Sequence, residues 1–209
     1  MREWDIEKIS QESIEAAHMA FPDAPPPTLR VIAFAAEFAA YMHRDHKRKG
    51  SGDPYFVHPM RVAKAVAPYV RPEGIAASLM HDVPEEVGLE REKVIELVRT
   101  LPLFPSRVRD IVRTLTHLPC NTKEHMLERI NGTMDTDAIL IKIADRTDNL
   151  LDGTVALGKR WLKKYAIQGQ ILYAGATAVG MTHHPLTKKL KRVINASILK
   201  ASRKRAEKK

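Results

Sequence analysis

The residues best suited to chemistry lie where an apolar stretch, residues 75–80, runs into His81 and Asp82. We expect a buried helix from residue 75 that Pro84 ends, because proline lacks an amide hydrogen and disfavours helical geometry in the residue before it. His81 and Asp82 would then lie side by side, with Glu85 about one turn beyond His81. Unpaired charge in an apolar core is costly, and a bound cation would reduce that cost. The stretch therefore predicts half of a metal site.

Two residues elsewhere could complete this site. His58 precedes Pro59, and proline suits the first turn of a helix, so we expect His58 at or just before a helix N-terminus. Asp145 lies in a largely apolar segment, where a charged carboxylate requires a partner. Two imidazoles and two carboxylates suit a borderline divalent ion such as manganese, iron or zinc, and they do not favour calcium.

Hydrophobic periodicity predicts the helices that must position these residues. Sustained alternating patterns typical of strands are absent from the sequence, so we expect an all-α fold, a helical bundle with a buried metal site. Thr28 is a good N-cap for the broadly apolar core helix that follows it. The expected helices cover residues 4–20, 29–42, 60–70, 75–83, 90–101, 105–117, 124–130, 137–151, 161–179 and 186–203.

Length and composition bound the class of protein. The 209 residues suit one main domain, residues 28–184, preceded by a helix and Pro-rich connection, residues 1–27, and followed by a basic helix and tail, residues 185–209. Cys120 is the only cysteine, which excludes an internal disulfide and a thiolate zinc site and favours a reducing compartment. The sequence contains neither an apolar signal core nor a membrane-spanning stretch, so we expect a cytoplasmic protein.

The formal net charge of +9 belongs to the C-terminal segment. Residues 185–209 contain ten Lys and Arg against the single Glu207, whereas the preceding 184 residues are balanced. Leu186, Leu190 and Ile198 share one helical face, so we expect the first half of this segment to pack on the domain. RNA or an anionic membrane is the alternative partner of the basic segment. The charge therefore indicates a terminal appendage and not a basic face across the domain.

Three motifs follow one another along the chain. They are Arg48-Lys49-Gly-Ser-Gly-Asp-Pro-Tyr-Phe-Val-His58-Pro59, His81-Asp82-Val-Pro-Glu85-Glu86 and Ile-Lys-Ile-Ala-Asp145-Arg146-Thr-Asp-Asn149. In this order and at these separations they resemble the HD-domain metal-dependent phosphohydrolases, in particular the (p)ppGpp hydrolases of RelA/SpoT proteins and of small stand-alone SpoT homologues. The resemblance covers residues 30–180.

The resemblance implies an activity and a metal. The reaction would remove the 3′-pyrophosphate from guanosine tetra- or pentaphosphate, a small nucleotide substrate. The metal would be Mn²⁺, with Fe²⁺, Zn²⁺ and Co²⁺ as alternatives. A divalent ion lowers the pKa of bound water from 15.7 towards roughly 7 and polarises a phosphoryl oxygen. By position, the family's four metal ligands fall on His58, His81, Asp82 and Asp145.

The resemblance also implies the residues around the metal. Arg48 and Lys49 would contact the guanine end of the nucleotide, and Asn149 would contact the nucleotide as well. Glu85 and Glu86 would position or activate water.

The sequence departs from the family at three positions. Glu86 stands where the second acid is usually Asp, and Leu151 stands where an Arg is usual. Asp148 replaces a residue that is commonly His or Tyr, and it adds negative charge near an anionic ligand.

Other interpretations of these residues stay open. In an inactive protein, Arg61 or Arg146 could pair with Asp145. An active enzyme could instead use another phosphoester, such as a nucleotide monophosphate or the 2′-phosphate of NADPH. A degenerate HD fold could serve as a nucleotide sensor or a nucleic-acid-associated module, although intact residues at all four ligand positions argue against degeneracy. The sequence allows an oligomer but does not predict one.

Overall fold

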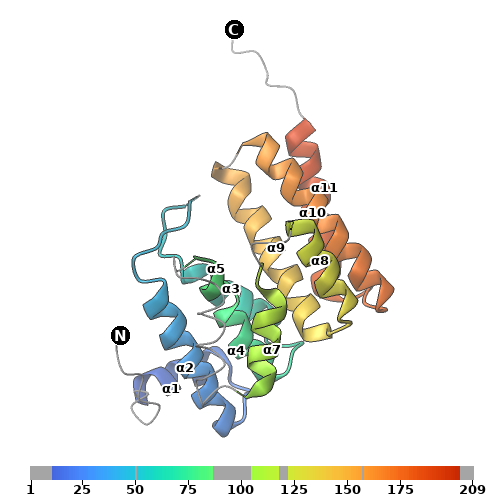
Figure 1. The fold of residues 1–209 in the computed structure, drawn as a ribbon. Coiled ribbons are helices and arrows are strands. Elements are labelled where there is room, and N and C mark those ends of the chain that lie inside the picture. Colours follow the sequence, from blue (N-terminus) through green and yellow to red (C-terminus); the bar gives the residue numbers. More distant parts are fainter. Residues whose placement is uncertain (1–10, 50, 87–104, 118–121, 157, 203–209) are drawn as a thin grey trace.

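The computed structural model describes residues 11–49, 51–86, 105–117, 122–156 and 158–202. Within these ranges the regular elements are helices, which confirms the all-α prediction (Figure 1). One isolated β-bridge pairs Lys47 with Pro54 in the loop between α2 and α3. The helices are α1 (Gln11–Ala20), α2 (Pro26–Met42), α3 (Val57–Val66), α4 (Pro72–Met80), α5 (Val83–Glu86), α7 (Ser106–Leu115), α8 (Lys123–Gly132), α9 (Thr136–Ala156), α10 (Lys159–Ala178) and α11 (Pro185–Ser202).

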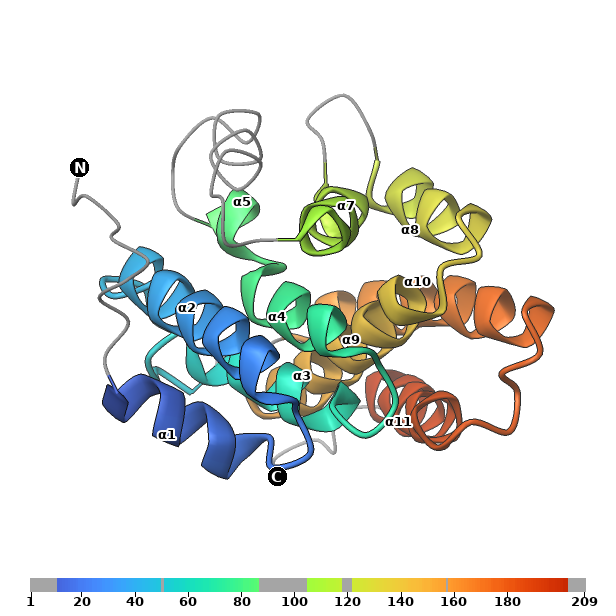
Figure 2. The same ribbon diagram turned by 90° about the horizontal axis from the view of Figure 1, so that it is seen from below.

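Helix α4 lies in the middle of the bundle, in contact with α2, α3, α7 and α9 (Figure 2). Residues 74–80 of α4 are all buried. Its small residues allow this close approach: a Cβ on Gly74 would lie only 2.9 Å from the Cβ of Val70 and 3.6 Å from that of Asp137. Packing on several sides therefore places the last turn of α4, and the His81 that follows it, in the core.

Helix α9 carries much of the polar chemistry of the fold. It packs against α3, α10 and α11 (Figure 1). Residues 137–147 are buried. The carboxylate of Asp135 caps the helix by accepting hydrogen bonds from the backbone N–H groups of Asp137, at 3.1 Å, and Ala138, at 3.3 Å. Arg107 of α7 donates to both oxygens of Asp135, at 2.5 and 2.6 Å. One side chain thus begins α9 and ties it to α7.

We expect Asp135→Ala to lower the free energy of unfolding by about 2 kcal/mol, because it removes a cap and a charge-assisted pair. Asp135→Asn keeps a capping oxygen and should lose less. Burial alone would raise the pKa of Asp135, but Arg107 and the helix N-terminus lower it below its ordinary value. The contribution of ionised Asp135 to the free energy of unfolding is therefore fully present above the unfolded pKa of about 3.9, and it is lost as pH falls through the pKa of Asp135 in the folded protein. Urea unfolding of both variants from pH 7 to pH 2 tests this, and an unchanged gap to wild type at pH 2 would contradict it.

Several helix boundaries differ from the sequence-based expectations. Thr28 does not cap α2, because Pro26 and Pro27 occupy its first turn, where no amide hydrogen is needed. Helix α3 begins one residue before His58 and ends at Val66, short of residue 70. Helix α9 continues beyond residue 151 to Ala156. The helix expected over residues 90–101 lies outside the described residues, as does Cys120.

The C-terminal helix α11 packs on α9 and α10, and Leu186, Leu190 and Ile194 are buried there. The expectation that the first half of the basic segment covers the domain is confirmed. Among the described residues, the helices are too short or too polar to cross a bilayer.

Candidate metal centre

Four predicted ligands converge from three helices. His58 lies in the first turn of α3, His81 is the C-cap of α4, and Asp145 lies midway along α9. His58, His81 and Asp145 are at most 3% exposed, and the side chain of Asp82 is 13% exposed. The structure thus brings together all four residues that the sequence predicted as ligands.

The local backbone at His81 differs from the expected continuous helix. Helix α4 ends at Met80, and His81 and Asp82 form a turn. Pro84 does not end that helix but lies in the first turn of the short helix α5, where a missing amide hydrogen costs little. The turn, and not a shared helix face, therefore directs both side chains to one point.

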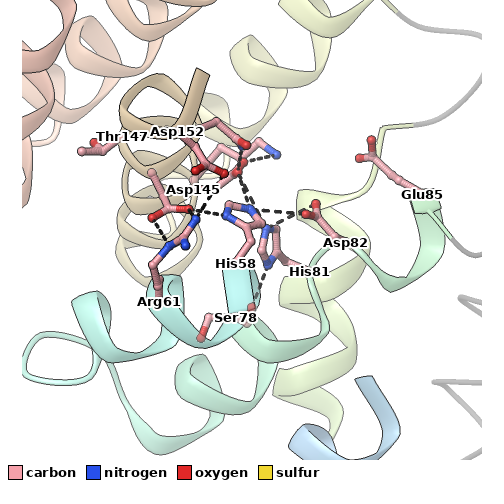
Figure 3. Close-up of polar contacts among 12 residues, drawn as sticks. His58, Arg61, Ser78, His81, Asp82, Glu85, Asp145, Thr147 and Asp152 are labelled. Atoms are coloured by element: carbon pink, nitrogen blue, oxygen red, sulfur yellow. Dashed lines mark hydrogen bonds and ion pairs between the residues drawn. The ribbon is translucent and has the colours of Figure 1, made fainter. Parts of the chain in front are cut away.

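The donor atoms of this cluster face one another (Figure 3). His58 Nε2 lies 3.2 Å from Asp145 Oδ1 and 3.4 Å from Asp82 Oδ2. His81 Nε2 lies 3.3 Å from Asp82 Oδ1 and 3.8 Å from Asp145 Oδ1. Neither buried Nε2 has a hydrogen-bond partner among the described residues. Ligand atoms of His58, His81 and Asp82 all lie within 4.8 Å of one another. Such a set fits a divalent metal, because both imidazoles turn an otherwise unsatisfied nitrogen to the same place.

The other ring nitrogens fix the orientation of these imidazoles. His81 Nδ1 donates to the carbonyl oxygen of Ser78 at 2.7 Å, so Nε2 is the ring nitrogen that faces the cluster. His58 Nδ1 lies 2.6 Å from Asp148 Oδ2, and Arg61 donates to both oxygens of Asp148, at 2.7 and 2.9 Å. The negative charge that Asp148 adds is therefore directed at His58 and Arg61.

Charges within the cluster shift one another's pKa values. Burial alone would raise the pKa of Asp82, but His81 and His58 hold it well below its ordinary value. Burial alone would lower the pKa of His58, but contacts with the carboxylates of Asp145, Asp148 and Asp82 raise it to about 10. A metal that binds His58 must therefore displace a proton.

Asp145 is paired with a lysine that the sequence analysis did not consider. Lys142 Nζ lies 2.8 Å from Asp145 Oδ2, and the Lys142 side chain is only 6% exposed. Burial alone would lower the pKa of Lys142, but the charges of Asp145 and Glu85 raise it. Of the two arginines that were expected to pair with Asp145 in an inactive protein, Arg61 binds Asp148 instead, and the cation at Asp145 is Lys142. The signal for Lys142 was its spacing, one helical turn before Asp145.

The residues expected to contact the nucleotide contact one another. Arg48 Nη2 donates to Asn149 Oδ1 at 2.8 Å, and Arg48 Nε donates to Asp152 Oδ2 at 2.9 Å. Asn149 Nδ2 donates in turn to Asp145 Oδ1. Lys49 is exposed. Arg48 and Asn149 therefore lie beside the candidate metal centre, and a ligand that contacts Arg48 must compete with Asp152.

The acidic pair is only partly within the described structure. Glu85 Oε2 lies 2.6 Å from Lys123 Nζ, and Glu85 Oε1 accepts a hydrogen bond from the backbone N–H of His117 at 2.8 Å. Figure 3 shows Glu85 apart from the imidazoles, beyond Asp82. Glu86 is the last residue of α5, and its side chain lies outside the described part of the chain.

Tyr55 is a further site residue that sequence reasoning missed. Its hydroxyl donates to Asp82 Oδ2 at 2.9 Å, and its ring stacks on His43 with centroids 4.7 Å apart. Burial lowers the pKa of His43 to about 4, so this imidazole is neutral at pH 7. Tyr55 belongs to the motif that ends in His58, and its position there was the available signal.

A cavity of about 440 Å³ opens over the cluster. This volume lies in the range of small-molecule sites, which is about 300–1,000 Å³. Asp82, Glu85 and Asp145 line it together with a group of cationic side chains, Lys47, Arg48, Lys49, Lys123, Lys142 and Arg146. The mixed lining can bind a metal at one place and an anionic ligand around it.

Two relatives of known name are similar to this chain in sequence. A GTP pyrophosphokinase of Myxococcus xanthus is 32% identical over 139 residues, which are 60% of this chain and 17% of that protein. A guanosine-3′,5′-bis(diphosphate) 3′-pyrophosphohydrolase of Aquifex aeolicus is 30% identical over 152 residues, 69% of this chain and 21% of that protein. The chain thus spans only about a fifth of the length of these relatives.

A solved structure has the same fold. It is described as a metazoan ortholog of SpoT that hydrolyzes ppGpp and plays a role in starvation responses. It has a TM-score of 0.63 and 23% sequence identity, and the match covers 79% of this chain and 94% of that one. The HD domain family matches residues 35–178, well over half of the sequence. The chain therefore belongs to the HD-domain family.

Proposed function

We propose that this chain is a metal-dependent phosphohydrolase that removes the 3′-pyrophosphate of (p)ppGpp to give GDP or GTP and pyrophosphate. The observation that carries the proposal is the pair of buried imidazole nitrogens that make no hydrogen bond among the described residues and face Asp82 and Asp145 beneath a cation-lined cavity. The names of the relatives and of the solved structure support the choice of substrate.

In this proposal His58, His81, Asp82 and Asp145 hold the metal. Two nitrogens and two carboxylates suit Mn²⁺, and Fe²⁺, Zn²⁺ and Co²⁺ accept the same donors. When bound, such an ion lowers the pKa of water and stabilises charge on a phosphoryl oxygen. The contribution of the chain is to hold the donor atoms in place before the metal arrives.

Glu85 is the residue that we assign to water. Lys123 and the His117 N–H hold both of its oxygens, which fixes the carboxylate at the wall of the cavity. From there it would orient a water or accept its proton, with Glu86 as the second acid. Arg48, Lys49 and Asn149 would bind the nucleotide. Arg48 would release its ion pair with Asp152 to contact the ligand.

Asp148 provides a test of metal binding that does not depend on activity. We expect Asp148→Ala to weaken Mn²⁺ binding about 10- to 100-fold, because groups that orient a ligating imidazole contribute that much to affinity. Isothermal titration calorimetry measures the affinity directly. Asp110→Ala is the matched control, because it removes an exposed carboxylate from α7. Equal affinities of the two variants would show that Asp148 does not position His58.

The substrate is tested with the purified chain and Mn²⁺, by incubation with ppGpp, pppGpp, NADPH and nucleotide monophosphates. We expect GDP and pyrophosphate from ppGpp, and loss of turnover with a chelator. Release of phosphate from NADPH without turnover of ppGpp would show that the chain is an HD-domain phosphohydrolase with a different substrate. Metal binding without turnover of any of these compounds would contradict the proposed function.

A further inference from the structure

A stack of three side chains forms part of the cavity wall beside α9 and α10. Trp161 and Tyr165 lie one turn apart on α10, and their rings stack with centroids 3.8 Å apart and an interplanar angle of 24°. The guanidinium carbon of Arg146, on α9, lies 4.2 Å from the centre of the Tyr165 ring. All three residues line the same cavity as Asp82 and Asp145.

Arg146 is a buried cation with unused hydrogen-bond donors. The residue is only 4% exposed, yet its Nε and Nη1 atoms have no hydrogen-bond partner among the residues that the structure describes. The hydrogen bond that Gln168 Nε2 donates to Glu124 Oε1 at 2.7 Å lowers the pKa of Glu124, and the charge of Arg146 lowers it further. The Glu124 carboxylate therefore already has a partner in Gln168. Buried donors without an acceptor are unfavourable, so this guanidinium is suited to an anion that enters from the cavity.

The packing around Arg146 holds it in this place. A Cβ on Gly169 would lie 3.0 Å from the Ile194 side chain, so the glycine allows α10 and α11 to pack closely here, and the same Cβ would lie at an ordinary contact distance, 3.6 Å, from Arg146 Cγ. Tyr165 covers the guanidinium one turn earlier on α10. The Tyr165 ring, itself stacked on Trp161, is therefore the surface against which the Arg146 guanidinium lies.

We propose that Trp161, Tyr165 and Arg146 form a nucleoside subsite, in which the base stacks on the aromatic pair and a phosphate oxygen of the same ligand accepts hydrogen bonds from Arg146. This inference rests on the proposed function and adds a specificity determinant to it. A planar ring joined to a polyanion matches an aromatic surface beside a guanidinium whose Nε and Nη1 have no hydrogen-bond partner among the described residues. Stacking tolerates any base, so this wall selects nucleotides over simple phosphates and leaves the choice of base to other contacts.

Tryptophan fluorescence tests the stacking without catalysis. The chain contains two tryptophans, and Trp4→Phe leaves Trp161 as the only one. We expect GDP and ADP, in the presence of Mn²⁺, to quench this fluorescence and pyrophosphate to leave it unchanged. Equal quenching by pyrophosphate, or GDP binding seen by calorimetry without any change in fluorescence, would overturn the proposal.

Kinetics separate the subsite from the reaction. Trp161→Ala should raise the KM for ppGpp about tenfold with little change in kcat or in Mn²⁺ affinity, since stacking of one base contributes on this order. Trp161→Phe should restore most of the loss, which a general folding defect would not allow. Arg146→Met should raise KM more than Arg146→Lys does. An unchanged KM in Trp161→Ala while wild type hydrolyses ppGpp would refute the subsite. Quenching by GDP in a wild-type chain that hydrolyses no nucleotide would refute the proposed reaction and retain the subsite.

Discussion

Asp82→Asn is expected to lower the rate of ppGpp hydrolysis by about a thousandfold or more, because a bound metal contributes several kcal/mol of transition-state stabilisation. The carboxamide keeps the shape of the side chain and can still accept the hydrogen bond from Tyr55, but it carries no charge to bind a cation. Asp45→Asn is the control. Asp45 lines the same cavity, but its side chain is 80% exposed, so we expect its loss to change the rate little.

The same variant separates metal binding from folding. Mn²⁺ should raise the melting temperature of wild type, because a ligand that binds only the folded state stabilises it. The melting temperature of Asp82→Asn should not respond to Mn²⁺. A variant that keeps both the Mn²⁺-induced shift in melting temperature and the rate would exclude Asp82 as a ligand.

Glu85→Gln is expected to lower kcat by about 10²- to 10⁴-fold, the range for loss of a general acid–base group, with Mn²⁺ affinity nearly unchanged. This separation follows from position, because Glu85 lies apart from the imidazole pair and is held by Lys123 and His117 (Figure 3). Single-turnover rates and calorimetry measure the two quantities.

Lys123→Met and Glu86→Gln complete this comparison. Lys123→Met leaves the Glu85 carboxylate in the chain but removes one of the groups that hold it, so we expect a smaller loss of kcat. If Glu85→Gln kept the wild-type kcat while Glu86→Gln lost it, the assignment of the two acids would have to be reversed.

The sequence could indicate which residues converge because their chemistry is unusual for their surroundings. Asp145 stands among apolar residues, and a buried carboxylate requires a partner whatever the tertiary structure. His81 and Asp82 follow the most completely buried helix in the described bundle. What the pattern could not predict was the turn at His81, because the tendency of Pro84 to end one helix also suits it to the first turn of the next.

The partners of the charged residues were less predictable. Arg61 and Asp148 are 87 positions apart, and Arg48 and Asp152 are 104 positions apart, so only the packing of α3 and the preceding loop on α9 brings them together. Asp148 was expected to add charge near an anionic ligand, and its actual contacts with Arg61 and His58 required the fold. By contrast, Lys142 was accessible from helical spacing alone.

The site draws Lys142, Asp145, Arg146, Asn149 and Asp152 from the single helix α9. Ten residues of α-helix rise about 15 Å, so the spacing of these five groups is set by the backbone hydrogen bonds of the helix. A substitution along α9 therefore keeps the spacing of the other groups, whereas a one-residue deletion would turn every later group by about 100°. Helix α9 thus sets the spacing of the site, and we expect an insertion or deletion in it to disrupt the site more than a substitution of any one of these side chains.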